Sequence, residues 1–267
     1  MSREYQVGDQ YVSESGSRQY QIGAEYLSET GGGIAFNTAS NSGYQAASAS
    51  YSWSHTCTGN NRFLAVDVAL LSVGQTVTGI TYNGVAMTLI GAQTTVSSVG
   101  RVESWGLANP ASGTNTIEVT LSGSIASAGC AVSYSGVQQT SPYANFNSAQ
   151  ATNVGAADAT VNVTTAETGS WVHGALATDD GNVTAEQTAR NEVNGAGGSG
   201  ADQDSNGPVA AGSTETSWTD VAALATWAIG GYELRPDTAA AIGGRTALNT
   251  RSNPLGIEIG MGWRMNL

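Results

Sequence analysis

Apolar and polar residues alternate with a period of two from about Tyr44 to Arg235, and this alternation restricts most of the chain to β structure. In TNTIEVTLSG, for example, Ile117, Val119 and Leu121 fall on one face of a strand. Turn-forming clusters such as NPASGT and DDGN separate the alternating segments, and no amphipathic helix of useful length interrupts them. We therefore predict an all-β fold, a jelly-roll-like sandwich of two antiparallel sheets over residues 34–235.

Three segments of this region carry more specific predictions. RFLAVDVALLSV places Leu64, Val66, Val68 and Leu70 on one face of a strand. TGITYNGVAMTLIG contains Asn83-Gly84, the strongest short signal for a β-hairpin. The stretch RNEVNGAGGSGADQDSNGPVAAGSTE, residues 190–215, is rich in Gly, Asp and Asn, so we predict a flexible surface loop there.

A repeat at the amino terminus sets residues 1–33 apart as an arm. REYQVGDQYVSES is followed by RQYQIGAEYLSET, and matching residues lie fifteen positions apart. Read as straight strands, each unit has its tyrosines and its central aliphatic residue on one side, and Ser15-Gly16-Ser17 forms a hinge between two docking units. The residues predicted to bind partners are Tyr5, Val7, Tyr11, Tyr20, Ile22 and Tyr26.

The arm is poor in apolar residues for its length. Ordering about thirty residues costs on the order of 30–60 kcal/mol of backbone entropy. Burying about eight apolar side chains returns roughly 1.5–3 kcal/mol each. The arm therefore requires another surface, which is its own sandwich, a neighbouring copy or a different protein. It is either an extra hairpin on the domain or a segment that ties chains together.

The carboxyl-terminal tail, residues 236–267, differs in charge from the rest of the chain. The strand alternation stops after Pro236, and residues 235–267 hold four arginines and two acids, a charge of +2 against -14 for the remainder of the -12 total. Arginines near Trp and Met suit an acidic protein surface. A disordered tail is the competing interpretation. The tail residues predicted to bind a partner are Arg245, Arg251, Trp263 and Arg264.

The overall charge excludes two classes of partner. The chain has 9 basic residues, all arginine, against 21 acidic residues. Nucleic-acid binding through phosphates needs clustered Lys and Arg, so we expect no nucleic-acid partner. The same balance argues against anionic membranes. The polar amino terminus lacks the apolar core of a signal peptide and no window of about twenty apolar residues exists, so we expect a cytosolic site of synthesis.

Neither histidine of the chain sits in a catalytic pattern. His173 shares a strand face with Trp171, Ala175 and Ala177, which favours a structural histidine whose hydrogen bonds are satisfied within the fold. His55 lies two residues from Cys57, and a metal or thiol site there is conceivable, but two ligands do not make a zinc site. No G-x-S-x-G precedes a helix, so we predict no catalytic residue and no cofactor.

Cysteine and acidic residues leave two further alternatives. Cys57 and Cys130 allow one disulfide, but in a reducing compartment two buried thiols are favoured. Asp202, Asp204 and Asn206, followed by Gly207, resemble the start of a calcium loop. The glutamate that closes such a loop is missing, because its place is taken by serine. We therefore predict no metal site except this weak calcium candidate.

Five segments together resemble a β-sandwich domain of bacteriophage and prophage structural proteins. They are NRFLAVDVALL, VTGITYNGVAMTLIG, VESWGLANPASGTNTIEVTLSG, AVSYSGVQQTSP and GSTETSWTDVAALATWAIGGYELRP, and they cover roughly residues 54–236. The amino-terminal repeat is similar to repeats that begin some phage-encoded proteins. Those repeats carry Pro-Gly where this chain has Gly8-Asp9 and Gly23-Ala24, so its turns depart from that pattern.

The resemblance implies a non-enzymatic virion protein. We expect a capsid decoration or cement protein that lies on the shell surface, is assembled in the cytoplasm of a bacterial host, and forms a homotrimer. Its partners would be the major capsid protein or other virion subunits, bound when the arm adds strands to neighbours by β-augmentation. The alternative is a glycan-binding or receptor-binding module of a tail fibre or a cell-surface adhesin.

Overall fold

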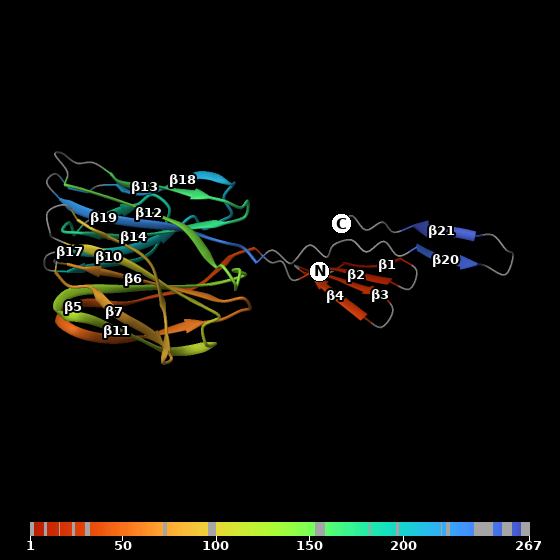
Figure 1. Cartoon of the computed structure of the whole chain (residues 1–267), viewed down its shortest axis with the longest axis horizontal. Helices are drawn as coiled ribbons and strands as arrows, with labels where there is room; N and C mark the ends of the chain where they lie inside the picture. The colour runs from red at the N-terminus through yellow and green to blue at the C-terminus, as the bar shows by residue number, and fades with distance from the viewer. Residues whose placement is uncertain are drawn as a thin grey trace. The chain divides into compact units, whose positions relative to one another are not determined.

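The computed structural model divides the chain into two units, one formed by residues 33–237 and the other by residues 1–32 and 238–267. Figure 1 shows strands throughout both units. The described residues are 3–7, 10–15, 17–22, 25–29, 33–71, 74–95, 100–152, 158–181, 183–195, 198–219, 221–222, 225–237, 248–252 and 258–262.

The larger unit is an all-β, antiparallel sandwich, which confirms the predicted fold class. The described part of the chain contains no helix that is long and apolar enough to cross a membrane. Three layers are stacked in this unit, one more than a simple two-sheet sandwich, and Figure 1 shows them one above another.

The first layer is a sheet that nearly closes into a barrel, here called the closed sheet. Strand β11 pairs with β7 along its first half and with β6 along its second half. Strand β10 pairs with both β6 and β9, and β7 pairs with β8. β8 and β9, the two ends of this strand order, do not pair with each other, but only Met87 separates them in the chain, so the sheet is nearly closed. The strands are β6 (Phe63–Leu70), β7 (Val77–Tyr82), β8 (Val85–Ala86), β9 (Thr88–Thr94), β10 (Arg101–Ala108) and β11 (Gly113–Ser135), with β5 (Ala35–Cys57) paired along β11.

The interior of the closed sheet is the first hydrophobic core. It holds the predicted face of β6, from Leu64 to Leu70, and the predicted inward face of β11, from Ile117 to Leu121. The hairpin at Asn83-Gly84 is confirmed, because Tyr82 pairs with Val85 across it. Asn83 and Gly84 have φ values of 51° and 75°, the left-handed backbone that such a tight turn requires.

The second layer is a five-stranded central sheet buried on both faces. Every residue of its three inner strands, β14, β17 and β19, is buried. One face packs against the closed sheet through Trp171 and Tyr232, and the other is covered by a small third sheet through Trp218. In order, the central strands are β12 (Tyr143–Thr152), β19 (Thr226–Leu234), β14 (Trp171–Thr178), β17 (Gly198–Asp204) and β16 (Thr188–Gly195); the third sheet is β13 (Ala159–Thr165), β18 (Gly212–Thr219) and β15 (Thr184–Ala185).

The prediction of a surface loop over residues 190–215 is wrong. This stretch contains most of β16, all of β17 and the start of β18, and β17 is an inner strand of the central sheet. Gly200 allows close packing between layers, because a Cβ there would lie 2.7 Å from the Cβ of Ala69. The two aspartates of this stretch, Asp202 and Asp204, are buried with polar partners, whereas Glu192 and Glu215 are exposed.

The amino-terminal repeat forms a four-stranded antiparallel sheet in the order β1-β2-β3-β4. Each repeat unit is one hairpin, closed by pairing of Val7 with Gln10 and of Ile22 with Glu25. The predicted hinge is wrong, because Ser15 pairs with Ser17 and joins the two hairpins into one sheet. The strands are β1 (Arg3–Val7), β2 (Gln10–Ser15), β3 (Ser17–Ile22) and β4 (Glu25–Glu29).

Because each repeat unit folds back into a hairpin, the residues that share a face differ from those of a straight strand. Tyr5 pairs with Val12, whereas Tyr11 pairs with Gln6. Since directly opposed residues of an antiparallel pair share a face, Tyr5 and Tyr11 belong to opposite faces of the hairpin. The straight-strand prediction, which put them together, is therefore wrong.

The carboxyl-terminal region also contains strands. β20 (Leu248–Ser252) and β21 (Glu258–Gly262) pair as an antiparallel hairpin, so the chain forms strands again after Pro236. Arg251 lies in β20, opposite Ile259. Arg245, Trp263 and Arg264 lie outside the described residues.

We expect Gly200→Ala to destabilise the sandwich by about 1–3 kcal/mol, because the added methyl group would overlap Ala69 and lie 3.2 Å from the Cβ of Ala128. Gly79→Ala in β7 is the matched control, since a Cβ there meets nothing within 4 Å. Urea unfolding of both variants measures the difference. Equal destabilisation by the two substitutions would contradict the close contact between the layers.

Candidate functional site

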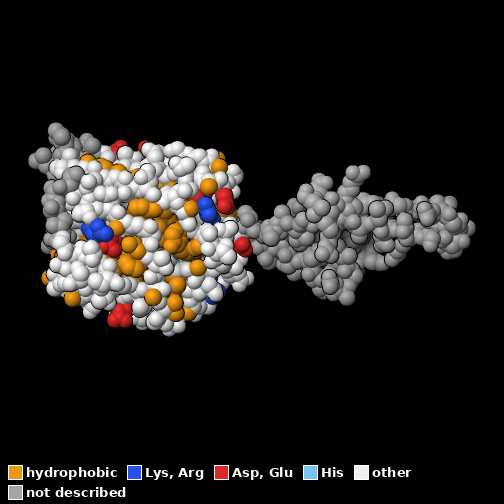
Figure 2. Space-filling model, in the orientation of Figure 1, with side chains coloured by type: hydrophobic (Ala, Val, Ile, Leu, Met, Phe, Trp, Pro, Cys, Tyr) orange, Lys and Arg blue, Asp and Glu red, His pale blue; other side chains and the backbone are white. Residues whose placement is uncertain are grey.

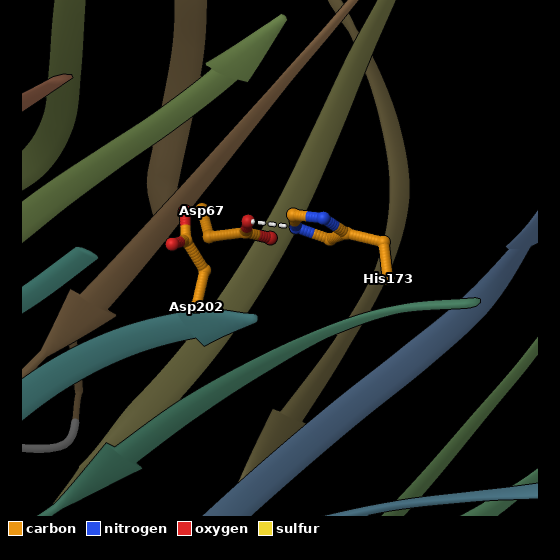
Figure 3. A group of neighbouring side chains, drawn as sticks. All are labelled: Asp67, His173 and Asp202. Carbon is orange, nitrogen blue, oxygen red and sulfur yellow. Dashed lines mark hydrogen bonds and ion pairs between the residues drawn. The ribbon is translucent and has the colours of Figure 1, made fainter. Parts of the chain in front are cut away.

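A cluster of titratable side chains lies buried between the closed sheet and the central sheet. Its centre is formed by Asp67, His173 and Asp202, none of which is more than 3% exposed. One potential ligand atom of each lies within 4.8 Å of the others. Figure 3 shows the imidazole of His173 directed at the carboxylate of Asp67, with Asp202 on the far side of that carboxylate.

Pairing within the central sheet brings the cluster together. His173 on β14 lies opposite Asp204 on β17, and two residues further along Ala175 lies opposite Asp202. Because strand side chains alternate, Asp202 and Asp204 lie on the same face of β17. That face is turned towards the closed sheet, where Gly200 meets Ala69.

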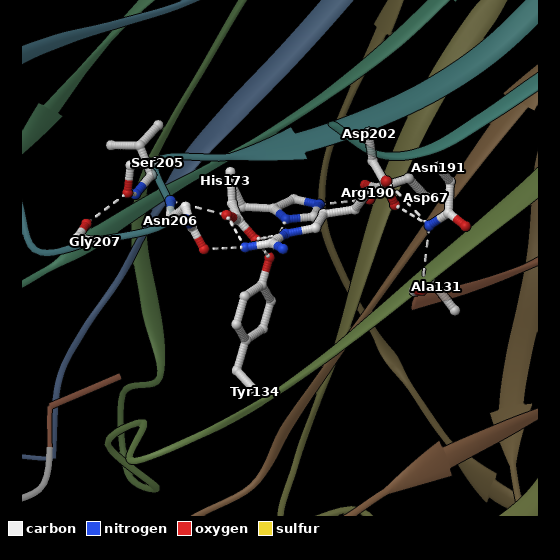
Figure 4. A network of polar contacts seen from close by, with 12 residues as sticks. Asp67, Ala131, Tyr134, His173, Arg190, Asn191, Asp202, Ser205, Asn206 and Gly207 are labelled. Atoms are coloured by element: carbon white, nitrogen blue, oxygen red, sulfur yellow. Dashed lines mark hydrogen bonds and ion pairs between the residues drawn. The ribbon is translucent and has the colours of Figure 1, made fainter. Parts of the chain in front are cut away.

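Two strands of the closed sheet contribute the remaining members of the cluster. Asp67 on β6 lies 2.7 Å from His173, measured from Oδ2 to Nε2. The Tyr134 hydroxyl on β11 lies 2.8 Å from Nδ1 of the same imidazole. This hydroxyl donates a hydrogen bond of 2.8 Å to Oδ2 of Asp204. The result is a continuous polar chain from Asp67 through His173 and Tyr134 to Asp204, which Figure 4 shows in its surroundings.

Arg190 on β16 terminates this chain at the edge of the layer. Its guanidinium donates two bonds of 2.8 Å, one to each carboxylate oxygen of Asp204, and one of 2.7 Å to Asn206 Oδ1. It also stacks over the ring of Phe36, with Cζ 3.9 Å from the centroid. Charge-assisted, bidentate bonds of this kind are among the strongest that a carboxylate accepts.

Asp202 has weaker partners. Asn191 Nδ2 donates to both of its oxygens at 3.0 and 3.1 Å, and this amide also donates to the backbone oxygen of Ala131. An amide neutralises no charge. Burial raises the pKa of Asp202 from 3.8 to about 7, with a lowering contribution from His173 and a raising one from Asp67.

The pKa of His173 is raised in spite of its burial. Burial alone lowers this pKa, but the adjacent Asp67 carboxylate, with Asp202 and Asp204 behind it, raises it further than burial lowers it. Burial, then Asp204, also raises the pKa of the Tyr134 hydroxyl well above its ordinary value, so this hydroxyl remains a donor.

The buried acids of the described residues divide into two groups. Five carboxylates are buried, and three of them have an arginine partner: Glu103 with Arg101 at 2.7 Å, Asp204 with Arg190 at 2.8 Å and Glu233 with Arg235 at 3.7 Å. The remaining two, Asp67 and Asp202, have no arginine partner and share one histidine. The cluster is therefore where the sandwich buries its least compensated negative charge.

The calcium loop proposed from sequence is not formed. Asp202 and Asp204 belong to a strand, and both oxygens of Asp204 and the side-chain oxygen of Asn206 accept hydrogen bonds from Arg190. A calcium loop needs such oxygens directed at one point by a sharp turn, which a strand does not provide.

The other sequence candidates are buried structural residues. His173 lies on the strand face that its neighbours predict. His55 bonds Ser40 Oγ through Nδ1 at 2.7 Å, and burial lowers its pKa to about 4. Cys57 and Cys130 are both free and buried, as expected for two thiols.

Exposed aromatic residues are scarce on the described part of the sandwich. Four of its tryptophans, including Trp171 and Trp218, are buried, and Trp53 is partly buried. The large hydrophobic residues that are exposed are Val85 and Leu89, at 53% and 43%. Figure 2 shows that hydrophobic side chains gather in the middle of one face, with few charges among them. A shallow groove of about 480 Å³ is lined by Leu107, Pro142 and Tyr143 among others.

The predicted partner-binding residues of the arm are placed by backbone pairing. Tyr5, Val12, Tyr20 and Leu27 form one cross-strand row through all four strands. Tyr26 lies opposite Gln21, outside that row. No family model and no curated protein sequence matches the chain.

Several members of the cluster were not predicted from sequence. Asp67 lies within the otherwise apolar FLAVDVAL, and this single charge in a fully buried strand was the available signal. Tyr134 and Arg190 gave no comparable signal in the sequence. Their contacts with Asp204 on β17 depend on how the strands that carry them, β11 and β16, are placed in the folded chain.

We expect the free energy of unfolding to fall as pH rises from about 4 to about 7. In this window the folded chain keeps the Asp202 proton that the unfolded chain has lost, so stability decreases, by on the order of 4 kcal/mol. The raised pKa of His173 extends the loss above pH 6.5. Urea unfolding in metal-free buffer across this range measures the slope. Asp202→Asn should remove most of the slope below pH 7, and an unchanged slope would show that another group is responsible.

Tyr134→Phe and Tyr232→Phe make the same chemical change at two fully buried positions. The Tyr134 hydroxyl bonds both His173 and Asp204, whereas the Tyr232 hydroxyl has no hydrogen-bond partner among the described residues. We expect Tyr134→Phe to cost about 1–3 kcal/mol and Tyr232→Phe to be nearly neutral. Thermal unfolding compares the two variants. Equal losses of stability would contradict the hydrogen bonds that link His173 to Asp204 through Tyr134.

Proposed function

We propose that this chain is a non-enzymatic structural protein of a bacteriophage virion, a decoration or cement protein that joins subunits of the shell. The sandwich is the body of the protein, and the amino-terminal sheet is the part that binds neighbours. The carboxyl-terminal hairpin adds a second contact. We expect closed cyclic symmetry, with a homotrimer as the assembled form.

The observation that carries this proposal is the organisation of the repeat. Its register collects Tyr5, Val12, Tyr20 and Leu27 into one row across a sheet that is a single layer of four strands. A sheet with an apolar face must bury that face against another layer to be stable. A repeat that builds such a sheet in a unit distinct from the sandwich is suited to docking.

The edges of the sheet provide the means of attachment. Strand β1 pairs with β2 and β4 pairs with β3, so each outer strand has one ladder within the described residues. An outer strand can extend the sheet of a neighbour through backbone hydrogen bonds. Two such edges and the carboxyl-terminal hairpin on one chain raise the total affinity through effective concentration.

The buried polar cluster supports the non-enzymatic part of the proposal. His173 and His55 are 0% and 1% exposed, so neither imidazole meets a substrate from solvent in this fold. The glycan-binding alternative has less support. Sugar-binding sites need exposed aromatic faces, and the described tryptophans are mostly buried.

The test uses empty expanded bacteriophage shells. We expect the full chain to co-sediment with these shells and to raise their melting temperature. A chain that lacks residues 1–32 should keep the thermal transition of the sandwich and lose shell binding.

Point substitutions separate the apolar row from the rest of the sheet. Tyr5→Ser with Tyr20→Ser should weaken shell binding at least 10-fold, a loss of about 1.4 kcal/mol or more. Gln6→Ser with Gln21→Ser, one position along the same strands, is the matched control and should bind normally. Full shell binding by the truncated chain would remove the basis of the proposal, and saccharide binding without shell binding would favour the alternative.

A further inference from the structure

The hydrogen bonds around His173 determine which of its ring nitrogens carries a proton. The Tyr134 hydroxyl has a single proton, and it donates that proton to Asp204, whose carboxylate also accepts two hydrogen bonds from Arg190. The hydroxyl oxygen therefore accepts its second bond from Nδ1 of His173, at 2.8 Å. Nδ1 carries a proton, and Nε2 of a neutral imidazole is left with a lone pair.

That lone pair faces negative charge. Nε2 lies 2.7 Å from Oδ2 of Asp67, which is ordinary for a hydrogen bond but repulsive for a lone pair against a bare carboxylate. The other oxygen of Asp67, Oδ1, is buried and has no hydrogen-bond partner among the described residues. Asp202, within 4.8 Å, brings a second carboxylate whose partner is an amide. A positive charge is needed at this point.

We propose that Nε2 of His173 and the carboxylates of Asp67 and Asp202 form a binding site for a divalent metal ion of the zinc type. Two buried carboxylates and one neutral imidazole carry a charge of -2, and a dication neutralises it. In the absence of metal the same site holds two protons, one between His173 and Asp67 and one on Asp202. Metal and protons therefore compete for one position in the sandwich.

The ligand set selects the kind of metal. Zinc accepts imidazole nitrogen and carboxylate oxygen at about 2.0–2.2 Å with tetrahedral geometry, which places neighbouring ligand atoms roughly 3.3 Å apart. The present separations, 2.7 Å for one pair and up to 4.8 Å among the three, lie on either side of that spacing. The unpartnered Oδ1 of Asp67 supplies a further oxygen. Calcium and magnesium require six or more oxygen ligands and no nitrogen, so they do not fit.

The surroundings match those of a metal-bound histidine. Such a histidine almost always donates its other ring N–H to an oxygen that holds the ring in place. Here Nδ1–H donates to Tyr134, which Asp204 and Arg190 hold in turn. Because the site is buried between two layers, the ion enters as the chain folds, and it then joins β6 of the closed sheet to β14 and β17 of the central sheet.

The test is to refold the full chain with Zn²⁺ or with a chelator and to remove unbound metal by gel filtration. We expect one zinc per chain by elemental analysis and a melting temperature higher than that of the chelated chain. Refolding with Co²⁺ should give the visible absorption of a tetrahedral site with nitrogen and oxygen ligands. Since each ion displaces two protons, apparent zinc affinity should rise about 100-fold per pH unit in weakly acidic buffer.

Matched variants assign the ligands. His173→Gln should abolish stoichiometric zinc, whereas His55→Gln, which removes the chain's other buried histidine, should retain it. Asp202→Asn keeps the shape of the side chain and an acceptor for Asn191, so it should fold and bind zinc at least about 10-fold more weakly. The proposal is overturned if the refolded wild-type chain contains no zinc, if both histidine variants bind zinc equally, or if Ca²⁺ or Mg²⁺ stabilises the chain as much as Zn²⁺ does.

Discussion

Burial of the central sheet on both faces is the constraint on which the rest of the sandwich depends. Its inner strands contact a layer above and a layer below, so their residues must be apolar, small or hydrogen-bonded within the protein. Glycine meets this demand where a second layer comes close. A Cβ on Gly174 would lie 2.5 Å from the Thr216 hydroxyl, and one on Gly231 would lie 2.9 Å from Val163. These glycines of β14 and β19, like Gly200 of β17, thus reflect tight packing, although glycine is also common in loops.

The same burial explains the organisation of the polar cluster. Removing ionised side chains from water is costly, and breaking a buried pair by removing one partner costs about 3–5 kcal/mol. The sandwich limits this cost by arranging Asp204, Tyr134, His173 and Asp67 in a chain in which each donor meets an acceptor. Because Asp67 and Tyr134 come from one layer and His173 and Asp204 from another, the chain also favours one alignment of the two sheets over others. Its incomplete point is the pair Asp67 and Asp202, where one imidazole serves two carboxylates.

The terminal sheet follows different rules, because the order of its strands is encoded by repetition. A fifteen-residue period, with a turn inside each unit and another between units, brings matching residues of the two units into register across the sheet. Arg3, Glu14, Arg18 and Glu29 form one row of alternating charge through all four strands, and Tyr5, Val12, Tyr20 and Leu27 form an apolar row. Cross-strand pairs of opposite charge add about 0.2–1 kcal/mol each, which favours this register over a shifted one.

The sequence by itself determined the local features: the period of two, the inward faces of β6 and β11, the turn at Asn83-Gly84 and the burial of two free thiols. These depend on a residue and its near neighbours, and such preferences act before distant parts of the chain meet. Only the tertiary structure decided that residues 190–215 contain strands and that Tyr5 and Tyr11 lie on opposite faces of a hairpin. It also decided that Asp67 and His173, 106 positions apart, share a hydrogen bond. A glycine and an aspartate have the same local preferences in a loop as in a buried strand, so their place is set by the layer that packs against them.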